Sequence, residues 1–284
     1  MDLGRQLARR KRWTVTAVAN ALRISRPHLS TTLNDQPEPK EQQTKPADLK
    51  LLERIKPIVE KRPTSGYRRV TAHLRREANE PPVNHKRVYR VMREAKMLLQ
   101  RYGPKPNLLH DGKIITLASD MRWCSDMFEV RCWNGEKVHV AFSLDCCDRE
   151  AIGWVAGNRH LDGTDVRDLI ALSVDARFRS TKTARDVEWL TDNGPPYTAN
   201  ATRAFASSCG LLPRNTPAYS PESNGMAEAF VKTIKRDYVY VTDLPDAETV
   251  LALLPSWFDD YNENQPHKGL KMLSPRQFRR LHTS

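Results

Sequence analysis

The feature that most constrains what this chain can fold into is a change in the spacing of its apolar residues near residue 118. Upstream, apolar residues recur with the spacing of amphipathic helices. Downstream, WCSDMFEV, KVHVAFSLD and AIGWVAG are strand-like, and NGEK supplies a hairpin turn between the first two. Helical and strand-like stretches then alternate. The pattern predicts an α/β fold in which small all-α units precede a mixed sheet with helices on its faces.

Positive charge is concentrated upstream of that change. The 284-residue chain has a net charge of +12, and residues 1–116 contain 26 basic and 11 acidic side chains, against 20 and 23 in the remainder. Lysine and arginine bind nucleic acid by displacing counterions from its phosphates. The asymmetry indicates that the N-terminal part binds DNA and that the acidic groups of the C-terminal part serve another purpose. A merely solvated basic surface is the alternative.

The first upstream segment has the pattern of two helices joined by a turn. Apolar side chains keep a helical spacing on both sides of a break at Arg23–Ser25, which predicts a helix-turn-helix unit over residues 1–36. The apolar face of its first helix consists of Val15, Val18 and Leu22. In the second helix we assign Arg26 and His28 to DNA contact. A plain helical hairpin is the alternative.

The second upstream segment, residues 48–98, repeats this arrangement. Val70 and Leu74 mark one helix, the tripeptide EPP ends it, and Asn84 begins another. The polar side of that last helix is almost wholly cationic and carries Lys86, Arg87, Arg90 and Arg93. Such a helix can lie in a DNA groove or along phosphates, so we predict DNA contact here. Pro57 should kink or split the preceding helix.

Three carboxylates stand at positions suited to a shared site. Asp126 lies in the first strand, on the face opposite Trp123. Asp192 ends a later strand and is followed by Asn193-Gly194, where open α/β sheets place ligand-binding groups. Glu228 lies on a helix that also carries Lys232 and Lys235. Taken singly, each acid is more often a surface carboxylate than a ligand.

Together these residues carry a family resemblance. The strings RWCSD, LDCCDRE, WLTDNG and SPESNGMAEAFVKTIKRDY resemble the ribonuclease-H-like catalytic core of bacterial insertion-sequence DDE transposases, an integrase-type core. YNENQPHKGLKMLSPRQF is similar to the C-terminal tail of that family, except that KMLSP stands where a Gly-Tyr-type sequence is more usual. The chain resembles the downstream product of the group that uses two reading frames. The likeness implies that Asp126, Asp192 and Glu228 are catalytic metal ligands.

The resemblance also implies partners and cofactors. Lys235 matches a basic residue that contacts terminal DNA, and we assign Lys232 to the same contact. The implied partners are double-stranded DNA, both the terminal inverted repeats and the target, and further copies of the chain on paired ends. Separately from the resemblance, hard cations such as Mg²⁺ prefer carboxylate oxygens. Two such ions about 3.5–4 Å apart would stabilise the attacking and leaving oxygens of an in-line displacement, and Mn²⁺ can substitute for Mg²⁺.

The sequence predicts four parts and an intracellular setting. The parts are a helix-turn-helix unit over 1–36, a second helical DNA-binding unit over 48–98, a ribonuclease-H-like core over 118–240 and a C-terminal helical extension over 241–284. Segments 34–47 and 99–117 have the composition of linkers. The five cysteines show no paired zinc-ligand spacing, and neither a signal peptide nor a long apolar run is present. We therefore expect a cytoplasmic, nucleoid-associated bacterial protein without a membrane partner.

Two other functions remain open at this point. A ribonuclease-H-like nuclease would use the same metal chemistry without strand transfer. A non-enzymatic helix-turn-helix regulator would use the upstream units alone and would leave the carboxylates without a role. Incubating the protein with labelled element-end DNA and Mg²⁺ or Mn²⁺ distinguishes the three functions. A regulator gives no reaction, a nuclease gives nicks and a transposase gives joined products.

Overall fold

The computed structural model describes residues 14–33, 46–77, 80–100, 116–215 and 225–282. Residues 1–50 and 51–284 form two compact units. The segments expected to be linkers lie largely outside the described residues. None of the described helices combines the length and the apolar character needed to cross a membrane.

The first unit contains the predicted helix pair, α2 (Val15–Ala21) and α3 (Arg26–Leu33). Thr14 caps α2, because its hydroxyl accepts a hydrogen bond from the Ala17 amide at 3.2 Å. Its small core consists of Val18, Ala19 and Leu29. The expected apolar face was wrong at Leu22, which is 41% exposed. Leu22 is the residue that ends α2, and Ala19 is buried in its place.

The second unit begins within α4, the first of three helices that share one core. Helix α4 (Pro46–Lys61) packs with α5 (Tyr67–Leu74) and α6 (His85–Glu94), and Asn84 caps α6 as predicted. The core contains Leu51, Ile55, Val70, Leu74, Val88 and Met92. Pro57 lies inside α4, which continues through it as one helix, so the predicted split does not occur. Ile55 is fully buried and Ile58 packs on the same core, so tertiary burial holds both sides of Pro57 in one helix. Helix α5 ends at Leu74, before the EPP tripeptide.

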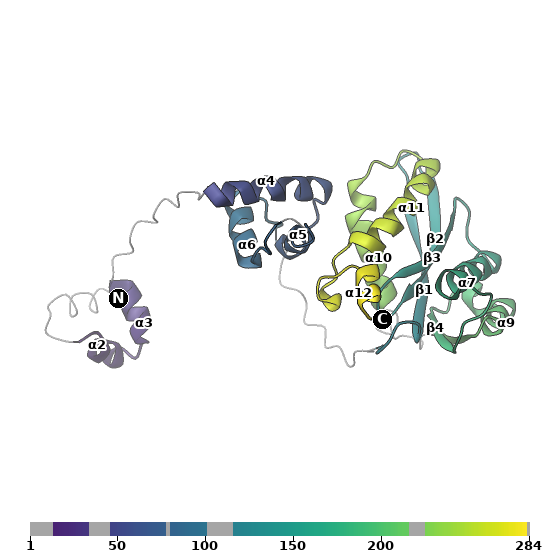
Figure 1. The fold of residues 1–284 in the computed structure, drawn as a ribbon, viewed down its shortest axis with the longest axis horizontal. Coiled ribbons are helices and arrows are strands. Elements are labelled where there is room, and N and C mark those ends of the chain that lie inside the picture. The colour runs from purple at the N-terminus through teal and green to yellow at the C-terminus, as the bar shows by residue number, and fades with distance from the viewer. Residues whose placement is uncertain (1–13, 34–45, 78–79, 101–115, 216–224, 283–284) are drawn as a thin grey trace. The chain divides into compact units, whose positions relative to one another are not determined.

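Downstream of these helices lies a five-stranded mixed sheet with the order β3-β2-β1-β4-β5 (Figure 1). Strands β1, β2 and β3 are antiparallel neighbours, whereas β4 and β5 continue parallel to β1. The strand bounds are β1 (Arg122–Arg131), β2 (Lys137–Asp145), β3 (Ala151–Gly157), β4 (Val187–Thr191) and β5 (Leu211–Asn215). This order confirms the predicted α/β fold with its ribonuclease-H-like mixed sheet.

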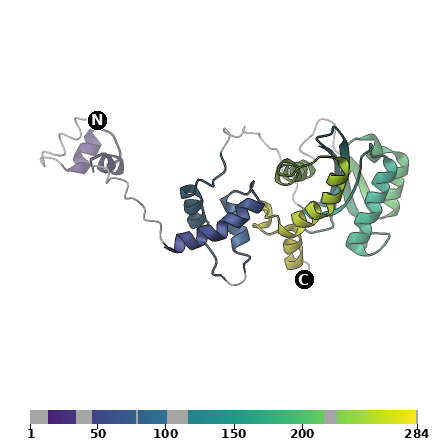
Figure 2. The ribbon, with the colours of Figure 1, turned by 90° about the horizontal axis from the view of Figure 1, so that it is seen from above.

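Helices cover both faces of the sheet, as Figure 2 shows. One face packs against α10 (Gly225–Asp237) and α11 (Ala247–Asn264) through residues such as Phe142, Phe230 and Phe258. The other packs against α7 (Gly163–Phe178) and α9 (Asn200–Ser208) around Trp123 and Trp189. Three further short helices are α8 (Pro195–Thr198), η2 (Val239–Val241) and η3 (Lys268–Leu270). Strand alternation places Cys124 and Trp123 in opposite layers, as the sequence predicted.

A buried ion cluster joins the last helix, α12 (Pro275–His282), to the sheet. Arg177 has a side chain only 1% exposed and contacts Asp148 at 3.0 Å and Glu150 at 3.4 Å. Glu150 also accepts from Arg276 at 2.9 Å and Arg279 at 3.2 Å, both on α12. The C-terminal tail is therefore an integral part of the second unit.

The α4–α6 helices are tied to the far end of α10 by a second group of ion pairs. Arg62 donates both terminal nitrogens to Asp260 of α11, at 2.8 and 2.6 Å. Arg69 and Thr64 both donate to Asp237, at 3.0 and 2.6 Å. We call these contacts the docking face. They link the helical unit to the last residue of the helix that begins near Glu228.

Candidate active site

Asp126 lies on the central strand β1, half-buried, on the same side of the strand as Cys124. Its carboxylate accepts a hydrogen bond from the Met127 amide at 2.7 Å, which fixes the orientation of one oxygen. Burial, and then the charges of Asp192 and Glu228, raise the pKa of Asp126 to about 6, although the Met127 hydrogen bond opposes the shift. Three distant parts of the sequence therefore act on one carboxyl group.

Asp192 follows the last residue of β4, the parallel neighbour of β1. The parallel register pairs Arg122 with Glu188 and Cys124 with Leu190, and continuing it by two residues sets Asp126 beside Asp192. The Gly194 amide donates to Asp192 Oδ1 at 3.0 Å. A side chain at position 194 would place its Cβ only 3.0 Å from the same oxygen, so glycine permits this close turn.

Glu228 lies in the first turn of α10, where its side chain is 44% exposed and pairs with Lys232 at 3.5 Å. Residues 216–224, directly before this helix, lie outside the described residues. Within the described part, no three His, Cys, Asp or Glu side chains lie close enough together to bind one metal ion. The three acids therefore interact through their charges without forming a closed ligand set.

The donor set nevertheless fits a hard divalent cation. Carboxylate oxygens are the ligands that Mg²⁺ prefers, and Mg²⁺ usually keeps several waters beside one or two carboxylates. A cation would also stabilise the ionised form of Asp126 against the burial and the like charges that raise its pKa.

Tyr197 on α8 is a residue that the sequence did not single out. It is 3% exposed, and its hydroxyl has no hydrogen-bond partner among the described residues. Burial, and then the charges of Asp126 and Asp192, raise the pKa of Tyr197 well above its ordinary value. A buried hydroxyl beside two carboxylates is a potential donor to a group bound there. Its place five residues after Asp192 was the only available signal.

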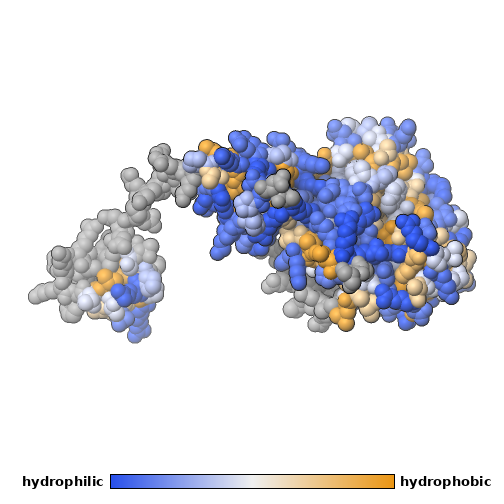
Figure 3. All heavy atoms as spheres, in the orientation of Figure 1, coloured by the Kyte–Doolittle hydropathy of each residue, from blue (hydrophilic) through white to orange (hydrophobic). Residues whose placement is uncertain are grey.

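The side chains predicted to contact DNA differ in their exposure to solvent. On α6, Lys86 and Arg93 are exposed, whereas Arg87 and Arg90 are half-buried. In the view of Figure 3 the surface of the α4–α6 helices is predominantly hydrophilic. On α10, Lys232 is exposed and Lys235 is half-buried. In the first unit Arg26 is exposed on α3, and the side chain of His28 lies outside what the structure describes. Lys232 is in contact with a predicted ligand, because it pairs with Glu228.

Comparison with known proteins gives the class. An HTH-like domain matches residues 46–105, and integrase core domains match residues 118–221 and 210–275. Among solved structures, a chain of the simian T-cell lymphotropic virus intasome is 15% identical, covers 75% of this chain and 70% of its own length, and has a TM-score of 0.48. The catalytic domain of Mos1 mariner transposase is 18% identical, covers 56% and 79%, and has a TM-score of 0.44. The domain matches define a DDE-type polynucleotidyl transferase of the transposase and integrase class.

The particular family follows from a full-length relative. The Escherichia coli transposase InsD for insertion element IS2A/D/F/H/I/K is 44% identical over 287 residues, which cover 99% of this chain and 95% of InsD. The chain belongs to this family of insertion-element transposases. Membership, together with the HTH-like domain, implies DNA binding.

Proposed function

We propose that this transposase cuts the phosphodiester bonds at the ends of its element and joins the freed strands to target DNA, with Asp126, Asp192 and Glu228 holding two Mg²⁺ ions. The observation that carries this proposal is the parallel register of β1 and β4, which sets Asp126 beside Asp192. The charges of Asp192 and Glu228 both act on the Asp126 carboxyl group, which supports it. When bound, the metal ions would stabilise the attacking and leaving oxygens of an in-line displacement.

The reaction has two steps that share one geometry. Water first attacks the phosphorus at the element end, and the 3′ oxygen leaves with a proton as a 3′-OH. That 3′-OH then attacks a target phosphodiester and releases a second 3′-OH, so no external energy source is needed. The chain contributes orientation, because backbone amides of Met127 and Gly194 hold one oxygen of Asp126 and of Asp192.

The remaining parts of the chain supply DNA binding in this proposal. Residues 1–36 and 48–98 are the DNA-binding units, residues 118–240 carry the chemistry, and residues 241–284 complete the core. Within these units the contacts fall to Arg26, His28, Lys86, Arg87, Arg90, Arg93, Lys232 and Lys235. Copies of the chain on paired element ends would bring both cut strands to one target.

The test uses purified protein, labelled element-end duplex and Mg²⁺ or Mn²⁺. Wild-type protein should give cleaved and joined products, whereas Asp192→Asn should bind the duplex without cutting it. Asp186→Asn is the matched control, because Asp186 is an exposed aspartate just before the same strand. Strand transfer by Asp192→Asn would remove this residue from the site. Cutting without joining by the wild type would instead identify a nuclease.

A further inference from the structure

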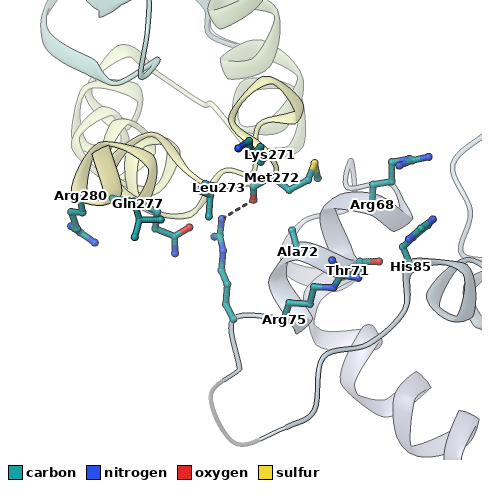
Figure 4. A pocket seen from close by; sticks show the side chains of 12 residues that line it. Arg68, Thr71, Ala72, Arg75, His85, Lys271, Met272, Leu273, Gln277 and Arg280 are labelled. Carbon is teal, nitrogen blue, oxygen red and sulfur yellow. Dashed lines mark hydrogen bonds between the residues drawn. The ribbon is translucent and has the colours of Figure 1, made fainter. Parts of the chain in front are cut away.

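A cleft of about 530 Å³ lies between α5 and the C-terminal tail, and we call it the α5–tail cleft (Figure 4). Arg68 and Arg75 stand on the α5 wall, while Lys271 and Arg280 stand on the tail wall. None of the twelve residues that line it is an aspartate or a glutamate. The cleft is therefore positively charged on both walls.

Some of these cations are satisfied within the protein. Arg76 crosses the cleft and donates to the carbonyl oxygens of Asn264 at 2.8 Å and Met272 at 3.5 Å, as the dashed line in Figure 4 shows for the latter. Arg280 pairs with Glu263 at 2.7 Å. The Arg76 hydrogen bonds join the two walls, whereas the Arg280–Glu263 pair lies within the C-terminal side. The charge of the remaining cations is not neutralised by either contact.

Three cations have no carboxylate partner within the described part of the chain: Arg68, Arg75 and Lys271. Arg68 lies over the ring of Tyr67, at 5.4 Å from its centroid. Arg75 donates its Nε to the carbonyl oxygen of Val83 at 3.0 Å, which orients its guanidinium. Lys271 stands on the opposite wall, on the C-terminal tail. The α5–tail cleft is therefore bordered by two guanidinium groups and one ammonium group, which are the donors that bind phosphate oxygens.

The backbone that presents Lys271 is strained. Lys271 and Met272 have φ angles of 54° and 69°, in the left-handed region that favours glycine. Such conformations persist where the surrounding structure holds them, and they cluster at sites that clamp ligands. The strained turn keeps a lysine, rather than a relaxed glycine, on the rim of the α5–tail cleft.

We propose that the α5–tail cleft binds backbone phosphates of double-stranded DNA through Arg68, Arg75 and Lys271. The proposal rests on the proposed function, because the ligand is the duplex that this transposase acts on. His85, the first residue of α6, also lines the cleft, and the next residue is the exposed Lys86. A duplex held along α6 would therefore reach the cleft. Phosphate contacts of this kind fix position without reading sequence.

The test measures binding of a fluorescein-labelled random-sequence duplex to the full-length chain over a series of salt concentrations. The slope of log Kobs against log salt should shrink by about 0.9 for each phosphate contact removed. The triple variant Arg68→Ala, Arg75→Ala, Lys271→Ala should therefore lose about 2.7 of the slope. Arg203→Ala, which removes an exposed cation on α9, is the matched control and should keep the wild-type slope.

Lys271→Gly keeps the test decisive if the triple variant fails to fold. Glycine relieves the positive φ, so a purely structural role predicts a higher Tm and unchanged DNA binding. We expect a higher Tm together with a slope smaller by about 0.9. Wild-type slopes in the folded variants would overturn the cleft proposal and leave the proposed function intact. Wild-type protein that binds no duplex at low salt would overturn both.

Discussion

Two carboxylates near opposite ends of α10, Asp126 on β1 and Asp237 on α10 itself, have opposite electrostatic settings. Near its start, Glu228 helps raise the pKa of Asp126, after burial and the charge of Asp192. At its last residue, burial would raise the pKa of Asp237, but hydrogen bonds and charges from Arg236 and Arg69 lower it below the ordinary value. Carboxylates that the protein neutralises with arginine hold its parts together. A carboxylate whose pKa is raised by burial and by other acids is suited to an external cation.

Replacing Glu228 is the most direct test of this contrast between carboxylates. We expect Glu228→Gln to reduce cleavage by about 10³-fold, the scale of losing a preorganised electrostatic group at a reacting centre. Because its side chain is 44% exposed, the unfolding free energy should change by less than about 0.5 kcal/mol. Single-turnover cleavage and urea denaturation measure the two effects. Cleavage near the wild-type rate, or a large loss of stability, would place Glu228 among structural carboxylates.

Asp237→Ala tests the docking face and should have the opposite profile. The side chain of Asp237 is 7% exposed and contacts Arg69, so removing it leaves a largely buried arginine unpaired. We expect the unfolding free energy to fall by about 3 kcal/mol. Asp243→Ala, an exposed aspartate beyond η2, is the control and should be neutral. Chemical denaturation measures the unfolding free energy of both variants. Equal values for the two would contradict the role given to these ion pairs.

Features that depend on neighbouring residues could be predicted from the sequence, whereas contacts between distant residues could not. The bounds of β2 and β3 were predictable because apolar runs end at turn residues, and Asn84 was recognisable as a cap because capping is local. The docking face was not, since Arg62 and Asp260 are separated by 198 positions and neither shows its partner locally. The split predicted at Pro57 does not occur, because the local backbone cost of proline is outweighed by the burial of neighbouring residues.

The candidate site divides in the same way. The three acids could be proposed as a site because a strand end and a helix start are local features and because their order resembles a known motif. Tyr197 was missed because its burial against Trp189, with ring centroids 5.8 Å apart, depends on how α8 packs on the sheet. Spacing from Asp192 alone does not distinguish such a tyrosine from an exposed one.

Tyr197→Phe tests the role of the buried hydroxyl near Asp126 and Asp192. Its buried hydroxyl has no partner among the described residues, so removing it should stabilise the protein by about 1 kcal/mol. The hydroxyl lies within the electrostatic influence of Asp126 and Asp192, so we expect slower cleavage in the more stable variant. Thermal denaturation measures the change in stability, and single-turnover assays measure the change in cleavage rate. Lower stability would show that the hydroxyl already has a partner in solution.

The smallest expected effect concerns the histidines beside the docking face. Burial, and then the charges of Arg149 and Arg69, lower the pKa of His267 to about 3, and its Nε2 is buried without a partner in the described part of the chain. Burial and the charge of Arg62 lower the pKa of His73 to about 4. Both rings are therefore neutral in the folded protein at a pH where the unfolded chain, with an ordinary value of 6.5, takes up protons.

The sign of the resulting pH dependence follows from this difference. The unfolded state binds more protons, so stability falls as pH drops below about 6.5 and continues to fall until the folded pKa is reached. For one such histidine the loss between about pH 7 and about pH 6 is about 0.7 kcal/mol. His267→Gln should remove that part of the dependence while His73 retains its own. Urea denaturation at a series of pH values tests this, and an unchanged dependence in His267→Gln would mean that the folded protein protonates His267 as readily as the unfolded chain does.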